Sequence, residues 1–182
     1  MKKFFFIIYL ILITNKAFAE FKENIIQNFK AINNISFNFE QNINGKKEDG
    51  NCTIQYPKKI YCNYNLENKK ILVSDGKSLV IKTNTSYYFY SLKRTPLNLI
   101  LDKKYLLNKI KSLDERIVEN KFINFTFSEN DNEINIFFDK QNYDLIGWQT
   151  LDIYQNLSIT FLSSIIKNKI IDKNLFILPR QN

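Results

Sequence analysis

The spacing of apolar residues changes near residue 34 from a helical period to a two-residue period. Over residues 20–33 the apolar positions recur every three or four residues, with charged and amide side chains between them. These positions are Phe21, Ile25, Phe29 and Ile32. The spacing predicts an amphipathic helix over residues 20–33. Directly after it, Ile35, Phe37 and Phe39 alternate with polar residues, which predicts a strand.

Short strands joined by tight turns are predicted for most of the remaining chain. Asn44-Gly45 is typical of a turn, and Asp75-Gly76 between two apolar runs predicts a hairpin. We expect strands over residues 35–40, 52–56, 60–64, 71–73, 78–82, 87–90, 122–127, 133–139, 145–154, 157–162, 170–171 and 176–178.

A second helical region interrupts this series of strands. Thr95 is a good N-cap residue, and Pro96 suits the first position of a helix. An apolar helix side follows, with a break expected near Asp102: Leu97, Leu101, Tyr105, Leu106, Ile110 and Leu113. The whole pattern predicts an α+β fold, in which roughly ten antiparallel strands form one curved sheet and the helices cover its concave face.

Residues 1–19 have the features of a cleavable secretory signal. Lys2 and Lys3 precede an uncharged apolar run over residues 4–13, and Ala17-Phe18-Ala19 fits the cleavage rule. The run is too short for a membrane-spanning helix, which needs about 20 residues. We therefore expect export and a single domain over residues 20–182 that begins at Glu20.

Two cysteines, Cys52 and Cys62, flank a predicted hairpin that turns near Pro57. An even cysteine count in an oxidising compartment favours a disulfide. In a hairpin, the two positions face each other and can be bridged if their Cα atoms come within about 6 Å. Two buried free thiols are the alternative.

The composition argues against most enzymatic chemistry. The chain contains no histidine, which removes the commonest general base and the commonest metal ligand. Its net charge of +8 comes from lysines interspersed with acids, so we expect a mixed surface and no nucleic-acid partner. We predict a monomer with no enzyme activity, no cofactor and no metal; a hydrolase that uses scattered carboxylates stays an alternative.

Six motifs, in chain order, give the sequence a resemblance to a known family. They are Phe37–Gln41, the glycine-led hairpin Gly50–Tyr64, Ile71–Leu79 with its Leu-Val-Ser-Asp-Gly core, Ser91–Leu97 with Thr-Pro, Leu145–Trp148, and Asn174–Pro179. They resemble the motifs of the periplasmic outer-membrane lipoprotein carriers, the LolA family.

This resemblance implies an open half β-barrel of about ten or eleven antiparallel strands, with helices that act as a lid over a hydrophobic cavity. It implies a periplasmic chaperone that binds the acyl chains of lipoproteins. The carrier would receive acylated lipoproteins from an inner-membrane lipoprotein-releasing transporter and pass them to an outer-membrane lipoprotein acceptor. A periplasmic lipid-binding sensor or regulator with a related half-barrel fold is the alternative function.

Strand alternation suggests which residues would line such a cavity. We expect acyl-chain contacts from Phe37, Phe39, Ile54, Leu79, Ile81, Phe89, Trp148, Ile159 and Phe161. Contacts with the lid are expected from Tyr56, Leu97 and Leu101. In the family, an arginine before the hairpin proline holds the lid through hydrogen bonds, whereas this chain has Tyr56 there. A phenol offers one donor against the five of guanidinium, so we expect the lid to be held differently.

Overall fold

The computed structural model describes residues 20–129, 132–152 and 154–181, and the expected signal sequence lies outside these ranges. Residues 20–31 form a helix, here called the first helix. The strands are β1 Asn34–Ile43, β2 Lys46–Gln55, β3 Lys59–Tyr64, β4 Ile71–Asp75, β5 Ser78–Lys82, β6 Tyr87–Ser91, β7 Arg116–Val118, β8 Phe122–Glu129, β9 Asn132–Asp139, β10 Leu145–Leu151 and β11 Leu157–Lys167. A 3₁₀ turn, Leu92–Arg94, and the helices α2, Leu97–Ile100, and α3, Lys103–Ser112, lie between β6 and β7.

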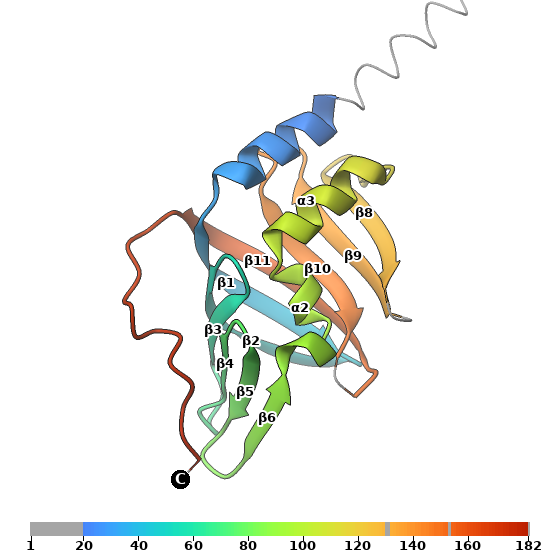
Figure 1. Ribbon diagram of the computed structural model, residues 1–182. Coiled ribbons are helices and arrows are strands. Elements are labelled where there is room, and N and C mark those ends of the chain that lie inside the picture. Colours follow the sequence, from blue (N-terminus) through green and yellow to red (C-terminus); the bar gives the residue numbers. More distant parts are fainter. Residues whose placement is uncertain (1–19, 130–131, 153, 182) are drawn as a thin grey trace, which may run out of the picture.

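All eleven strands belong to one antiparallel sheet with the order β6-β5-β4-β3-β2-β1-β11-β10-β9-β8-β7. Every neighbouring pair is consecutive in the chain except β1 and β11, which join two meanders at the centre of the sheet. The outermost strands β6 and β7 do not pair with each other, so the curved sheet stays open (Figure 1). The prediction of an open antiparallel half-barrel is therefore confirmed.

The first helix and α3 lie over the concave face of the β8–β10 half of the sheet (Figure 1). Phe29 of the first helix meets Phe138 of β9 edge to face, with ring centroids 6.1 Å apart. Leu106 and Ile110 of α3 are buried in the same core. Lys22 donates a hydrogen bond to the carbonyl oxygen of Leu113 at 2.6 Å and so joins the two helices. This half of the concave face is filled by packed side chains.

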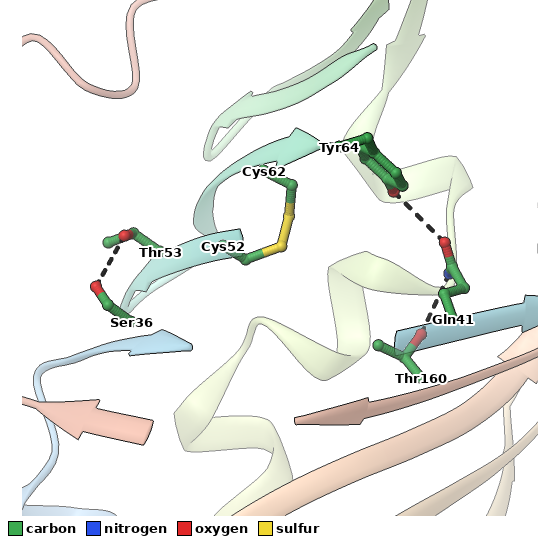
Figure 2. Close-up of a disulfide and its surroundings, with 7 residues drawn as sticks. All are labelled: Ser36, Gln41, Cys52, Thr53, Cys62, Tyr64 and Thr160. Atoms are coloured by element: carbon green, nitrogen blue, oxygen red, sulfur yellow. Dashed lines mark hydrogen bonds between the residues drawn. A yellow bond between two sulfur atoms is a disulfide. The ribbon is translucent and has the colours of Figure 1, made fainter. Parts of the chain in front are cut away.

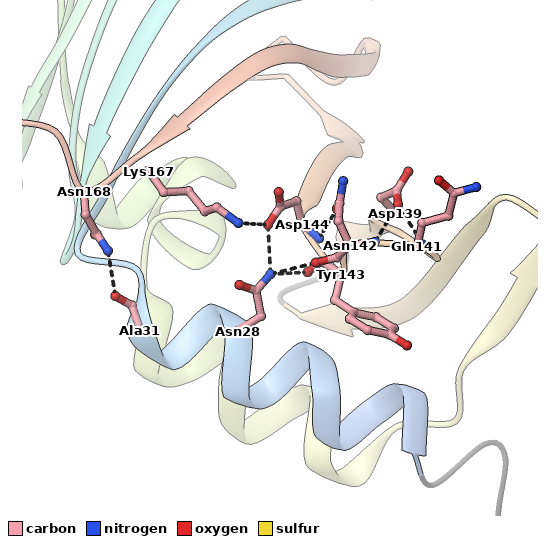
Figure 3. Close-up of polar contacts among 9 residues, drawn as sticks. All are labelled: Asn28, Ala31, Asp139, Gln141, Asn142, Tyr143, Asp144, Lys167 and Asn168. Carbon is pink, nitrogen blue, oxygen red and sulfur yellow. Dashed lines mark hydrogen bonds and ion pairs between the residues drawn. The ribbon is translucent and has the colours of Figure 1, made fainter.

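Polar contacts fix the first helix to the sheet (Figure 3). The amide nitrogen of Asn28 donates to the Tyr143 carbonyl at 3.0 Å and to the Asp144 carboxylate at 2.8 Å. Lys167, at the end of β11, pairs with the same carboxylate at 2.7 Å. Asn168 donates to the carbonyl of Ala31 at 3.0 Å. The first helix is thereby tied to the turn before β10 and to the residue that follows β11.

The helical region after β6 is divided as the sequence predicts, with α3 starting after Asp102, whose carboxylate accepts from the Tyr105 amide at 3.0 Å. The expected role of Thr95 is wrong in detail. Its hydroxyl donates to the Leu92 carbonyl at 2.9 Å, and Pro96 takes the cap position of α2.

The two strands expected at residues 170–171 and 176–178 do not form. Both edges of β11 are already occupied, by β1 and β10, so the chain that leaves it cannot add another strand beside it. Instead, this segment crosses the convex face of β3–β5 (Figure 1). Tyr87 donates to the Pro179 carbonyl at 3.2 Å, and Phe176 is only 5% exposed.

We expect Phe176→Ala to lower the free energy of unfolding by roughly 3 kcal/mol, because it removes a buried aromatic ring from the segment that covers the convex face. Urea denaturation followed by circular dichroism measures the change. Ile177→Ala is the matched control, since Ile177 is 65% exposed, and it should change stability by less than about 0.5 kcal/mol. Equal effects of the two substitutions would contradict this account of the segment.

Candidate functional site

The other half of the concave face contains a cavity of about 180 Å³. Its walls come from β1–β5, β10 and β11, and the start of α2 lies over it. It is lined by Phe37, Phe39, Gln41, Ile43, Cys52, Ile60, Cys62, Tyr64, Lys70, Leu72, Leu79, Ile81, Thr95, Pro96, Leu97, Trp148, Thr150, Leu151, Asp152, Tyr154, Ser158 and Thr160. Ligand pockets usually measure about 300–1,000 Å³. The cavity must therefore enlarge before it can hold a long apolar chain.

Five of the residues expected to contact acyl chains line this cavity. They are Phe37, Phe39, Leu79, Ile81 and Trp148. Phe37 and Trp148 meet edge to face across β1 and β10, with ring centroids 6.4 Å apart. Leu97, expected in the lid, also lines the cavity, from α2. These five residues come from β1, β5 and β10, so strand alternation gives the inward direction in each of these strands.

Four other expected contacts lie elsewhere. Ile54 is fully buried in the core beside the cavity and is absent from its lining. Phe89 pairs with Val80 on the convex face and is 59% exposed. Ile159 and Phe161 also face the convex side, because Ser158 and Thr160, their neighbours in β11, face the cavity. Polar residues thus occupy the two inward positions of β11 that line the cavity, the reverse of the pattern on which the expectation relied.

Cys52 and Cys62 are directly opposite each other in β2 and β3, with Cα atoms 4.1 Å apart, and they form a disulfide (Figure 2). Both cysteines line the cavity. The bridge joins neighbouring strands of the cavity wall and so restrains their separation.

Lys58, which the sequence did not point to, contacts the junction between α2 and α3. This junction, Leu101 and Asp102, is here called the hinge. The backbone N–H of Lys58 donates to the Leu101 carbonyl at 3.0 Å, and its ammonium group lies 3.1 Å from the Asp102 carboxylate. Leu101 itself is fully buried and contributes its carbonyl to this contact. Lys58 is in the β2–β3 turn with φ +68°, which turns its N–H toward the hinge. No sequence pattern identified this residue, because its contact depends on the turn geometry.

Tyr56 lies two residues before Lys58 and contacts different elements. Its ring packs edge-on against Phe29 at 5.4 Å, and the Lys103 ammonium group is 5.8 Å from its centroid. Its hydroxyl group is buried and has no hydrogen-bond partner within the described ranges. Burial raises the pKa of this phenol above its usual value. Tyr56 therefore packs against the first helix and α3, whereas Lys58 makes the hydrogen bond and the ion pair to the hinge.

The open end of the cavity carries charged and polar side chains. Lys70 pairs with the buried carboxylate of Glu48, and Lys46 lies 3.1 Å from it. Burial opposes the charge of Glu48, but these lysines outweigh it and hold the pKa of the carboxyl group below its usual value. Burial and the nearby Glu48 raise the pKa of Tyr64. At neutral pH the Glu48 carboxylate is therefore ionised and is shared by two lysines.

Within the described ranges, no group of three or more histidine, cysteine, aspartate or glutamate side chains could hold a metal ion. None of the helices in the same ranges has the length and hydrophobicity needed to cross a membrane.

Solved structures with similar folds share little sequence with this chain. A LolA superfamily protein from Nitrosomonas europaea has a TM-score of 0.47 at 7% identity, over 88% of this chain and 97% of that one. LprF from Mycobacterium bovis has a TM-score of 0.46 at 12% identity, over 85% of this chain and 95% of LprF. The Mycobacterium tuberculosis lipoprotein LppX has a TM-score of 0.45 at 10% identity, over 86% of this chain and 99% of LppX.

No curated protein matches the chain in sequence. The family model for the outer membrane lipoprotein carrier protein LolA, however, matches residues 30–178, which include the whole sheet, the cavity, α2 and α3. This match covers well over half of the chain, and it agrees with the six motifs and with the open half-barrel. The chain therefore belongs to the LolA family.

Proposed function

We propose that this protein is a periplasmic carrier that binds the acyl chains of lipoproteins and moves them from the inner to the outer membrane. The observation that carries the proposal is the apolar cavity of the open half-barrel, which is covered by a short helix tied to the β2–β3 turn. In this proposal the chain is exported by the signal at residues 1–19 and has no enzyme activity.

The energetics of the lid suit a carrier that must also release its cargo. Each buried CH₂ group of an acyl chain contributes about 0.8 kcal/mol, so several long chains would bind almost irreversibly in a permanently open cavity. Ile100 and Leu101 are buried at the lid. Exposing either side chain would cost about 1.5–3 kcal/mol. Binding that displaces the lid is weakened by this cost, and return of the lid favours release.

The proposed partners follow from the need to keep the acyl chain out of water. An acyl chain that leaves a membrane must not be exposed to water, so loading requires direct contact with a membrane protein that extracts it. We propose an inner-membrane lipoprotein-releasing transporter for loading and an outer-membrane lipoprotein acceptor for unloading.

The first test measures release of a triacylated lipoprotein from membranes that contain a competent transporter. We expect the protein without residues 1–19 to produce a soluble one-to-one complex, detected by size-exclusion chromatography. Ile81→Glu should abolish the complex, because it places a charge in the cavity wall. Phe89→Glu is the matched control on the convex face and should retain release, since Phe89 is already 59% exposed. If wild-type protein releases nothing, the carrier proposal is wrong.

The second test concerns the Lys58 contact. Lys58→Met keeps the aliphatic stem and removes the ion pair with Asp102, which is partly solvated and therefore worth about 0.5–1 kcal/mol. We expect hydrogen exchange over residues 97–101 to become about two- to fivefold faster, and acyl binding to tighten by a similar factor because the closed state loses stability. Mass spectrometry of exchanged peptides measures the first effect.

Lys59→Met is the control for this second test, because Lys59 lies on the convex face, 5.9 Å from the ring of Phe176. Exchange over residues 97–101 that is the same in both variants would show that the ion pair of Lys58 does not hold the lid.

A further inference from the structure

One wall of the apolar cavity is polar. Gln41 of β1 is paired with Thr160 of β11, and Ser158 of β11 is paired with Thr150 of β10. All four side chains line the cavity. They form a continuous group across three neighbouring strands, here called the hydroxyl patch, which faces the apolar wall made by β3–β5.

The hydrogen bonds within this patch use hydroxyl oxygens as acceptors, so the hydroxyl O–H groups are not used as donors. The Gln41 amide donates to the Ser158 hydroxyl at 2.9 Å and to the Thr160 hydroxyl at 3.2 Å (Figure 2 shows the Thr160 contact). The Gln41 oxygen accepts from the Tyr64 hydroxyl at 3.5 Å. Because Ser158 and Thr160 act as acceptors here, their own O–H groups stay available to donate.

Thr150 is the least satisfied member of the patch. It is 6% exposed, and its hydroxyl oxygen has no hydrogen-bond partner within the described ranges. A buried hydroxyl without a partner destabilises a protein, so buried polar groups are nearly always paired. A threonine in this position is readily explained if a ligand in the cavity supplies the missing acceptor.

The charges around the patch indicate what kind of acceptor fits. Lys70 is already paired with Glu48. The Asp152 carboxylate accepts from the backbone amides of Tyr154 at 2.7 Å and Asn156 at 2.9 Å. Lys70, the one cation among the described residues that line the cavity, is therefore engaged by an acid and is not free to neutralise a phosphate or a carboxylate. The unused groups are neutral O–H donors, which suit a neutral carbonyl oxygen.

We propose that the hydroxyl patch recognises the carbonyl group that joins an acyl chain to its ester or amide, with Thr150 as the specificity-determining residue. This inference rests on the proposed acyl-binding function and defines its ligand more narrowly. The cavity distinguishes acylated molecules from plain hydrocarbon and from ether lipids, because only an acyl group places a strong acceptor at the start of the apolar chain.

The test compares three single-chain probes of equal length by isothermal titration calorimetry on the protein without residues 1–19. They are monolauroyl glycerol, an ester; N-lauroyl ethanolamine, an amide; and the dodecyl ether of glycerol. We expect the ester, the amide or both to bind about tenfold more tightly than the ether, which corresponds to one hydrogen bond gained by a buried hydroxyl. The better of the two carbonyl probes identifies whether O-linked or N-linked chains are recognised.

Variants assign this preference to Thr150. Thr150→Val keeps the side-chain shape and should reduce carbonyl binding to the level of the ether, while ether binding and thermal stability are retained. Thr150→Ser restores the hydroxyl and should restore the preference. Thr53→Val is the control: the Thr53 hydroxyl is bonded to Ser36 at 2.8 Å outside the cavity (Figure 2). The Thr53→Val variant should lower stability and leave the preference for carbonyl probes unchanged.

The outcomes distinguish a failure of carbonyl recognition from a failure of acyl binding. Equal binding of ester, amide and ether by wild-type protein overturns carbonyl recognition and leaves acyl binding in place. A preference that persists in Thr150→Val also overturns the role of Thr150. If none of the three probes binds, the proposed acyl-binding function fails with it.

Discussion

The pairing of β1 with β11 is the contact on which the rest of the structure depends. It is the one neighbouring pair in the sheet that joins strands distant in the sequence, and it connects the two meanders into one surface. Its register also sets which side chains face the cavity. A shift by one residue would turn Ser158 and Thr160 outward and bring Ile159 and Phe161 inward. The cavity therefore has a polar wall only because this register is fixed.

The two halves of the concave face have different roles as a consequence of how they are covered. The first helix and α3 are bound to the β8–β10 half by packed aromatic rings and by the Asn28 contacts. The cavity in the β1–β5 half is bordered by the start of α2 and by Asp152 and Tyr154, which follow β10. A single lysine from the β2–β3 turn holds the hinge beside it. Stability is thus concentrated in one half, and the other half is left able to open.

The sequence predicted the features that depend on local periodicity. Phe37 and Phe39 line the cavity, as the alternation of apolar and polar residues in β1 predicts, and the helical region is interrupted at Asp102, where a break is expected. The failures have non-local causes. Ile159 and Phe161 look like inward residues, yet the inward positions of β11 are the polar ones. The contact of Lys58 depends on a turn whose conformation brings its backbone amide to the hinge, and no periodicity encodes that.

Gly147 shows how the polar wall is accommodated within the sheet. A Cβ atom at this position would lie 2.6 Å from the backbone oxygen of Thr160 and 3.2 Å from the ring of Phe161. A side chain here would therefore push β10 away from β11, between the strands that carry Thr150 and Thr160. The ring centroids of Phe161 and Phe137 lie 6.1 Å apart, on either side of the glycine on the convex face. The glycine thus lets Phe161 of β11 pack outside the sheet, while the hydroxyl groups of Ser158 and Thr160 in the same strand line the cavity inside it.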